Sequence, residues 1–274
     1  YQYSDRIRHV LTAHEQGAAH AADGYARATG KTGVVFATSG PGATNLVTGI
    51  ATAFMDSIPM VAITSNVANS LIGRDAFQEV YITGITMPIT KHNFFVNKVE
   101  DLAHAVREAF RIAATGRKGP VLVDVTKDVS AALCEFEPKE AEHQVKMPTA
   151  SDEEIQKIAD MINQAERPAI YCGGGVPASD AGHELQELIH KADIPIAYTM
   201  MAVGIVGYND THSLGMIGMH GSVAANKAVD QADLVLALGT RFSDRVALNT
   251  EKFAQRATKV QVDIDESEIN KNAV

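Results

Sequence analysis

The chain has 274 residues, a length typical of about two domains. Hydrophobic residues make up 46% and charged residues 21%, which are the proportions of a globular protein rather than a disordered or collagen-like one. With 24 Lys and Arg against 33 Asp and Glu, the formal net charge of −9 argues against a nucleic-acid partner. No uninterrupted apolar run reaches the ~18 residues of a membrane helix, so a membrane-spanning protein is excluded.

Cysteine usage is sparse, with only Cys134 and Cys172. Two cysteines make neither a disulfide framework nor a four-ligand zinc site. This suits a reducing compartment, and we expect the protein in the cytoplasm.

Charge is distributed unevenly along the chain. Residues 1–135 hold equal numbers of basic and acidic residues, so residues 136–274 carry the whole −9. The polar, proline-broken stretch at 135–142 is typical of a linker. We therefore expect an N-terminal domain at 1–135, a linker at 136–150 and a second domain at 151–274.

The N-terminal part alternates predicted helices with short apolar strands. An alanine-rich helix over 18–28 ends near Gly30, and residues 33–38 form an apolar strand. Residues 39–42, Ser-Gly-Pro-Gly, follow that strand and open a helix that runs to about residue 55. The remaining predicted elements are a strand over 60–64, a helix over 100–115 and a strand over 120–125.

The second part repeats this rhythm after a helix start at Ser151, with Glu154 three residues later. Its predicted helices cover 152–165, 180–192 and 222–231, and its predicted strands cover 168–171, 194–198, 234–238 and 259–264. Apolar runs of this length between longer helices are typical of parallel sheets covered on both faces. The fold class is therefore α/β, with two parallel-sheet domains.

Glycine-rich turns follow two of the predicted strands, at 39–42 and at 173–175. Open α/β sheets bind ligands at the carboxyl ends of their strands, so both turns are candidate ligand contacts. Neither turn has the full dinucleotide-binding pattern, and Ser39 lacks the preceding glycine of a hydrolase elbow. Taken alone, these glycines are better explained by tight turns than by ligand binding.

The ten histidines form no recognised metal-binding pattern, so we expect no metal ligands among the residues of this chain. Glu15 stands at the start of the first predicted helix. Its position alone favours a solvated helix-start glutamate.

An ordered set of motifs resembles the large catalytic subunits of the acetolactate (acetohydroxyacid) synthase family, which use thiamine diphosphate. The resemblance covers essentially the whole chain. It rests on residues 14–30 (HEQGAAHAADGYARATG), 38–45 (TSGPGATN), 75–79 (DAFQE), 91–92 (KH), 119–124 (GPVLVD), 126–128 (TKD), 173–175 (GGG), 218–221 (GMHG), 239–246 (GTRFSDRV) and 263–265 (DID).

The resemblance implies a role for Glu15, a hydrogen bond to N1′ of the coenzyme's aminopyrimidine. This contact favours the imino tautomer, whose nitrogen removes the weakly acidic C2 proton of the thiazolium. A dry pocket strengthens such a bond. Gly40, Pro41, Gly42 and Asn45 are implied coenzyme contacts beside it.

The implied reaction decarboxylates pyruvate and joins the two-carbon unit to a second 2-keto acid, pyruvate or 2-ketobutyrate, in branched-chain amino acid biosynthesis. Arg245 matches the arginine that binds the carboxylate of the second acid, a role suited to the forked guanidinium. A surface arginine paired with Asp244 is the alternative. Phe77, Gln78 and Lys127 match residues at the active-site entrance; core packing of Phe77 and a solvated Lys127 remain open.

The resemblance also implies a Rossmann-like FAD-binding second domain, in which the flavin undergoes no redox turnover. The implied contacts are Gly174, Gly175, Thr199, Met200, Gly218, Met219, His220, Gly239, Arg241, Arg245 and Asp263, together with Arg117 of the first domain. Two departures from the family pattern are Ser65-Asn66-Val67 in place of Gly-Gln-Val, and Ser243 in place of an aspartate.

The sequence contains no Gly-Asp-Gly motif, which in this family holds Mg²⁺ and the coenzyme diphosphate. We therefore interpret the chain as a fragment with an incomplete pyrimidine-binding domain and a truncated FAD domain. The resemblance implies a homodimer or homotetramer, with a small regulatory subunit as a further possible partner. The fragment alone is predicted to be inactive. Another thiamine-diphosphate and FAD enzyme, such as pyruvate oxidase, and a non-catalytic nucleotide-binding module are the alternatives.

Overall fold

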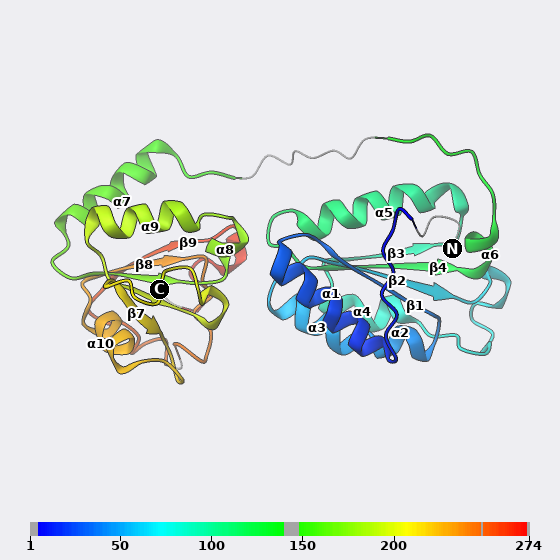
Figure 1. Cartoon of the computed structure of the whole chain (residues 1–274), viewed down its shortest axis with the longest axis horizontal. Helices are drawn as coiled ribbons and strands as arrows, with labels where there is room; N and C mark the ends of the chain where they lie inside the picture. The colour runs from blue at the N-terminus through cyan, green and yellow to red at the C-terminus, as the bar shows by residue number, and fades with distance from the viewer. Residues whose placement is uncertain (1–4, 140–147, 248, 273–274) are drawn as a thin grey trace. The chain divides into compact units, whose positions relative to one another are not determined.

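The structure, a computed structural model, describes residues 5–139, 148–247 and 249–272. The chain divides into two compact units, residues 1–146 and 147–274, whose elements are labelled in Figure 1. Part of the expected linker, residues 140–147, lies outside the described residues.

The first unit is built on a four-stranded parallel sheet with the order β1-β2-β4-β3. Helix α5 (Val99–Ala114) covers one face, and α1 (Glu15–Thr29) and α3 (Val47–Met55) cover the other (Figure 1). Buried side chains fill the space on both sides of the sheet, among them Ile50 and Leu122 on the α1 face and Ala109 on the α5 face. The strands are β1 (Gly33–Ala37), β2 (Met60–Asn66), β3 (His92–Val96) and β4 (Pro120–Thr126).

Helix α1 begins three residues before its predicted start, because the His14 side chain caps it by accepting a hydrogen bond from the Gln16 amide at 3.1 Å. Gly30 ends it in the left-handed conformation, with φ of 70°. The early start places Glu15 in the first turn of the helix.

Two further features of the first unit differ from the sequence-based expectations. The helix expected after β1 is divided at Leu46 into α2 (Pro41–Asn45) and α3. Strand β3 was not predicted, because this edge strand alternates only weakly between buried and exposed side chains and begins with His92 and Asn93. The short remaining elements are η1 (Asn69–Leu71), α4 (Ile82–Thr86), η2 (Met87–Ile89) and α6 (Lys127–Ala131).

The second unit holds a five-stranded parallel sheet with the order β7-β6-β5-β8-β9. The chain moves outward from β5 to β7 and then returns to β8 beside β5, so the topological switch point lies between β5 and β8. The strands are β5 (Pro168–Cys172), β6 (Ile196–Tyr198), β7 (Ser213–Met216), β8 (Leu234–Leu238) and β9 (Thr258–Val262).

Helices cover both faces of this second sheet, as Figure 1 shows with α9 on one side and α10 on the other. Ser151 caps α7 with a reciprocal hydrogen-bond pair to Glu154, as its sequence predicts. The helices are α7 (Asp152–Gln164), α8 (Gly175–Ala178), α9 (Gly182–Ala192) and α10 (Val223–Gln231), with single turns η3 (Met200–Ala202) and η4 (Glu266–Glu268). The predicted class, two parallel-sheet α/β domains, is confirmed. Among the described strands of this unit, β7, which contains Gly215, was missed, and so was the short helix α8.

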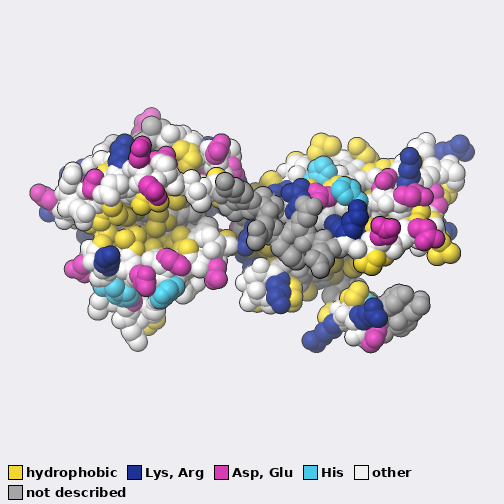
Figure 2. All heavy atoms as spheres, turned by 90° about the horizontal axis from the view of Figure 1, so that it is seen from above, with side chains coloured by type: hydrophobic (Ala, Val, Ile, Leu, Met, Phe, Trp, Pro, Cys, Tyr) yellow, Lys and Arg dark blue, Asp and Glu magenta, His cyan; other side chains and the backbone are white. Residues whose placement is uncertain are grey.

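The surface agrees with the uneven charge of the sequence. Figure 2 shows acidic side chains spread over the visible face of the second unit, on the left, with few basic ones. Cys134 is exposed, Cys172 is buried, and neither forms a disulfide. Among the described residues, no helix combines the length and the apolar character needed to cross a bilayer.

Candidate functional site

The first candidate site centres on the Glu15 carboxylate, at the start of α1. Glu15 is half-buried, and its Oε2 accepts a hydrogen bond from Asn45 Nδ2 at 3.0 Å. This hydrogen bond is the main reason that the pKa of Glu15 lies below its usual value. The carboxylate is therefore ionised at neutral pH and held in one orientation, unlike the freely solvated glutamate that its position alone suggested.

The glycine turn after β1 passes directly beside Glu15. Gly40 has φ of 62°, and a Cβ there would lie 2.8 Å from Gln78 Cβ. A Cβ on Gly42 would lie 2.7 Å from Thr38 Cγ2 and 3.5 Å from Glu15 Oε1. Glycine is therefore required at Gly40, a side chain at Gly42 would displace Thr38, and the turn brings Gln78 and Glu15 close together.

The loop that carries Phe77 and Gln78 is anchored by the Glu79 carboxylate. Its oxygens accept hydrogen bonds from the amides of Gly73 and Ala76, the first at 2.5 Å and the second at 3.0 Å, and these bonds lower the pKa of Glu79. Gln78 is half-buried with φ of 61°, whereas Phe77 is 88% exposed. The core alternative for Phe77 is therefore wrong.

Lys127 is exposed at the first residue of α6, immediately after β4. Pro41 is likewise exposed, at the first residue of α2. Lys127 follows β4 and Pro41 follows β1, and these strands are parallel members of one sheet. Both residues therefore lie at the carboxyl ends of the strands, as does the glycine turn beside Glu15.

Behind this edge lies a buried polar network around Asp124, in the middle of β4. Its carboxylate accepts hydrogen bonds from Thr64 Oγ1 at 2.7 Å and from Asn66 Nδ2 at 2.6 Å. Burial raises the pKa of Asp124, and these two bonds oppose the rise. Asn66, one of the departures from the family pattern, thus has a defined partner, which sequence reasoning missed because 58 residues separate the pair.

The second candidate site lies at the switch point of the other sheet. Gly173, Gly174 and Gly175 follow β5, and Gly239 follows β8. The Gly175 amide donates to Gly239 O at 3.0 Å, and a Cβ on Gly175 would lie 2.6 Å from Gly239 Cα. The two turns therefore pack backbone against backbone, and glycine is required for that approach.

A second backbone contact joins the turn after β7 to the segment that contains Arg245. Gly218 has φ of 103°, and the Met219 amide donates to Arg245 O at 2.8 Å. The Asn226 side chain secures the turn, because its Oδ1 accepts from Gly218 N at 3.0 Å and its Nδ2 donates to Gly218 O at 3.1 Å. Asn226 was missed because it lies on α10, with no motif linking it to Gly218.

The Arg245 side chain is 69% exposed, and its Nε lies 3.7 Å from Asp244 Oδ2. Its Nη1 lies 4.0 Å from Met219 Sδ. This places Arg245 in the pair with Asp244 that sequence reasoning kept as an alternative, and beside one of the predicted cofactor contacts. His220, next along the chain, is exposed.

Thr199 and Met200 follow β6 at the same edge. The Thr199 amide donates to Cys172 O at 2.9 Å, whereas its hydroxyl oxygen is buried and has no hydrogen-bond partner within the described residues. A buried hydroxyl without a partner is costly unless a ligand supplies one. Met200 is 68% exposed.

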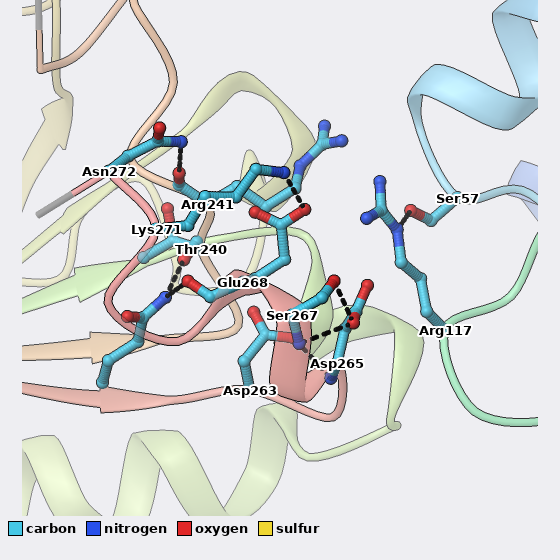
Figure 3. A network of polar contacts seen from close by, with 11 residues as sticks. Ser57, Arg117, Thr240, Arg241, Asp263, Asp265, Ser267, Glu268, Lys271 and Asn272 are labelled. Atoms are coloured by element: carbon cyan, nitrogen blue, oxygen red, sulfur yellow. Dashed lines mark hydrogen bonds and ion pairs between the residues drawn. The ribbon is translucent and has the colours of Figure 1, made fainter.

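Figure 3 shows the polar groups around Arg241 and Asp263, just beyond β8 and β9. Asp263 Oδ1 accepts from the Asp265 amide at 3.0 Å, and Asn272 Nδ2 donates to Arg241 O at 2.9 Å. In the first unit, Arg117 Nε donates to Ser57 Oγ at 2.9 Å. Arg241 and Arg117 therefore each lie in a hydrogen-bonded segment of their own unit.

Two profiles of known families match the chain. "Thiamine pyrophosphate enzyme, N-terminal TPP binding domain" matches residues 1–85, and "Thiamine pyrophosphate enzyme, central domain" matches residues 155–274. With the Glu15 site in the first unit and the glycine turns in the second, the chain belongs to the thiamine pyrophosphate enzymes.

Individual relatives narrow the likeness to acetolactate synthase large subunits, which confirms the resemblance. The chain is 50% identical over 273 residues to an acetolactate synthase of Mycobacterium leprae. The matched region is 98% of this chain and 44% of that protein. It is 49% identical to the acetolactate synthase large subunit of Corynebacterium glutamicum, over 98% of this chain and 43% of that protein. The corresponding subunit of Pyropia yezoensis is 47% identical over 100% of this chain and 47% of that protein. The chain thus spans less than half the length of these relatives.

Proposed function

We propose that this chain supplies the pyrimidine side of the thiamine-diphosphate site and the FAD-binding domain of an acetolactate synthase large subunit. The enzyme would decarboxylate pyruvate and ligate the two-carbon unit to pyruvate or 2-ketobutyrate, in branched-chain amino acid biosynthesis. The observation that carries the proposal is the ionised Glu15 carboxylate, fixed by Asn45 at 3.0 Å beside the turn at Gly40 and Gly42.

The residues of the first unit fit a pyrimidine. Thiamine diphosphate, when bound, supplies the acidic carbon at which 2-keto acids react. Glu15 accepts a hydrogen bond from the ring nitrogen N1′ and stabilises positive charge there, since its lowered pKa keeps it ionised. Asn45 orients the carboxylate, and the missing Cβ of Gly42 leaves room beside Glu15 Oε1.

The second unit fits a dinucleotide such as FAD. Gly175 is exposed and Gly239 is half-buried at the switch point, where doubly wound sheets bind such ligands. The buried Thr199 hydroxyl is available to a ligand group. Further contacts in the proposal are made by Gly174, Met200, Gly218, Met219, His220, Arg241, Arg245 and Asp263, with Arg117 contributed by the first unit.

Substrate binding is assigned to the exposed groups. Arg245 binds the carboxylate of the second 2-keto acid, for which it must exchange its long contact with Asp244 for a forked one. Phe77 packs on the substrate, and its 88% exposure leaves it accessible to do so. Gln78 and Lys127 contribute polarity and positive potential at the entrance.

The proposed enzyme also needs Mg²⁺ and a second subunit. No Gly-Asp-Gly sequence is present to hold the metal and the diphosphate, so this chain alone is expected to be inactive. Val10, Leu11 and Phe36 are 72%, 98% and 68% exposed on the first unit, which supports burial of this region in a homodimer or homotetramer. A regulatory subunit remains a possible partner, and the two unpaired cysteines support a reducing, cytoplasmic location.

The test compares products in the full-length protein supplied with pyruvate, thiamine diphosphate, Mg²⁺ and FAD. We expect acetolactate rather than hydrogen peroxide; peroxide as the main product would assign a pyruvate oxidase. Glu15→Gln should lower acetolactate formation by about 10²–10⁴-fold while FAD is retained. Glu108→Gln, on the opposite helical layer, is the matched control and should leave the rate unchanged. A Glu15→Gln rate equal to the control would reduce the chain to a binding module.

A further inference from the structure

Three side chains of the second unit converge at the edge of the sheet opposite the glycine turns. His190 lies in the last turn of α9, and Asp210 and His212 lie in the loop that leads into β7. The Ile196 amide, at the start of β6, donates to His212 O at 2.9 Å. The cluster therefore lies at the amino ends of β6 and β7, whereas the glycine turns follow the carboxyl ends. Figure 2 shows histidine side chains among acidic ones on the surface of this unit.

The Asp210 carboxylate lies between the two imidazoles. Its Oδ1 is 3.0 Å from His212 Nδ1, and its Oδ2 is 3.1 Å from His190 Nε2. The two rings are nearly perpendicular, with an interplanar angle of 87° and centroids 5.1 Å apart. One ligand atom from each of the three residues lies within 4.8 Å of the other two.

These separations are close to those of a tetrahedral zinc site. Zinc bonds of about 2.0–2.2 Å to histidine and aspartate imply ligand-to-ligand distances of about 3.3–3.6 Å. The two nitrogen-to-oxygen distances fall slightly below that range, and the His190 side chain is 54% exposed and able to adjust. The exposure also leaves a fourth position for water.

The surroundings support one specific orientation of His212. Its Nε2 lies 2.8 Å from Asp193 Oδ1, and its Nδ1 lies 3.0 Å from Asp210 Oδ1, so the ring is held between the two carboxylates. Metal-bound histidines commonly donate their second ring nitrogen to a carboxylate in this way. The His212 amide also donates to Asp210 Oδ1 at 2.9 Å, which orients the central ligand.

We propose that His190 Nε2, Asp210 and His212 Nδ1 bind one divalent transition-metal ion of the zinc class, with Asp193 as the orienting carboxylate. The ion fastens the end of α9 to the loop before β7. Its position at the amino ends of the strands makes it a structural site, distinct from the proposed coenzyme and flavin contacts. The site escaped the sequence search because a whole strand, β6, separates His190 from the other two ligands.

The two carboxylates also interact electrostatically with the ring between them. The carboxylates of Asp193 and Asp210 raise the pKa of His212, and hydrogen bonds from His212 lower the pKa of Asp210.

The experiment uses the full chain, prepared without a polyhistidine tag, stripped with chelator and titrated with Zn²⁺. Metal content after gel filtration should reach one ion per chain, and Co²⁺ in its place should give the visible absorption of a four-coordinate ion. His190→Gln should weaken Zn²⁺ binding by at least about tenfold, and Asp193→Asn by about tenfold.

His183→Gln is the matched control, because His183 lies on the same helix, 80% exposed and 3.3 Å from Glu187. It should bind Zn²⁺ as the unchanged chain does. Because His190 is exposed at a helix end, its variant is expected to fold, which circular dichroism checks. Equal Zn²⁺ affinity of the unchanged chain and His190→Gln, or no binding by either, would overturn the proposal.

Discussion

In both units a glycine turn follows the carboxyl end of a parallel strand, but the two turns pack against different groups of the protein. In the first unit, Gly40 approaches both the side chain and the backbone of Gln78, and Gly42 approaches the side chains of Thr38 and Glu15. In the second, Gly173 and Gly175 pass the backbone of Gly239. The first turn therefore borders a charged side chain, and the second borders the backbone of another turn.

We therefore expect substitutions at the two turns to affect different properties, activity in the first unit and stability in the second. A single carboxylate, Glu15, carries the proposed chemistry of the first unit, so its loss should abolish activity with little effect on folding. In the second unit, the turn at 173–175 is defined by its close approach to the Gly239 backbone. Substitutions there should act first on stability.

The largest effect is expected for Gly239→Ala. Gly239 has φ of 58°, and its added Cβ would lie 2.6 Å from Gly175 Cα. The left-handed conformation and the backbone overlap together should lower the free energy of unfolding by about 3 kcal/mol or more. Hydrogen exchange of the β5 and β8 amides in the full chain measures the change.

Gly207→Ala is the control in the same unit, since nothing lies within 4 Å of its added Cβ. It should change the exchange free energy by no more than about 0.5 kcal/mol. Equal protection of β5 and β8 in Gly239→Ala and Gly207→Ala would show that the backbone contact between the turns is unimportant.

The next effect concerns the side-chain network of the first unit. Asn66→Ala removes one of the two side-chain donors to the buried Asp124 carboxylate, leaving that charge poorly satisfied. The free energy of unfolding should fall by about 1–3 kcal/mol, measured by hydrogen exchange of β2 and β4. Ser65→Ala, at the exposed neighbour, should be close to neutral; a loss equal to that of Asn66→Ala would refute the role of the Asp124 bond.

Lys91 gives the first unit a specific pH dependence. Burial lowers the pKa of Lys91 to about 8, while its ammonium donates to Ile112 O and Thr115 O at the end of α5. Between this pKa and the usual lysine pKa of 10.5, the unfolded chain binds more protons than the folded one. The free energy of unfolding should therefore rise with pH across this window, and Lys91→Met should flatten the rise. Denaturant titrations at several pH values test this; parallel curves for the two proteins would contradict it.

The smallest effect is expected where glycine approaches nothing. Gly24 is exposed in the middle of α1, and its added Cβ would meet no atom within 4 Å. Gly24→Ala should stabilise the first unit by about 0.5–1 kcal/mol, because alanine lowers the conformational entropy of the unfolded chain. Thermal unfolding checks the sign, and destabilisation would indicate a contact that the structure lacks.

Many of the strands could be predicted from short runs of apolar residues. Residues 60–64 and 234–238 were predicted as strands because they are apolar runs, and they are apolar because both strands are buried in sheets covered on both faces. Strands β3 and β7 were missed because they lie at sheet edges, where polar and small residues replace that pattern. The local pattern of apolar residues depends on burial, and edge strands are less buried than central strands.

The candidate sites were less predictable from local sequence. The motif resemblance identified Glu15, but its partner Asn45 is 30 residues away, and only the fold pairs them. The anchoring of Gly218 by Asn226 and the convergence of His190 on Asp210 have no sequence signal, because helices and strands intervene. Such contacts depend on tertiary arrangement rather than on spacing.

The most direct test of the account measures the proton at C2 of thiamine diphosphate bound to the full-length protein. Its exchange with deuterium, followed by quenched-flow NMR, should slow by about a hundredfold or more in Glu15→Gln and remain unchanged in Glu108→Gln. Exchange in Glu15→Gln as fast as in the unchanged enzyme would contradict the assignment of Glu15 to the pyrimidine ring.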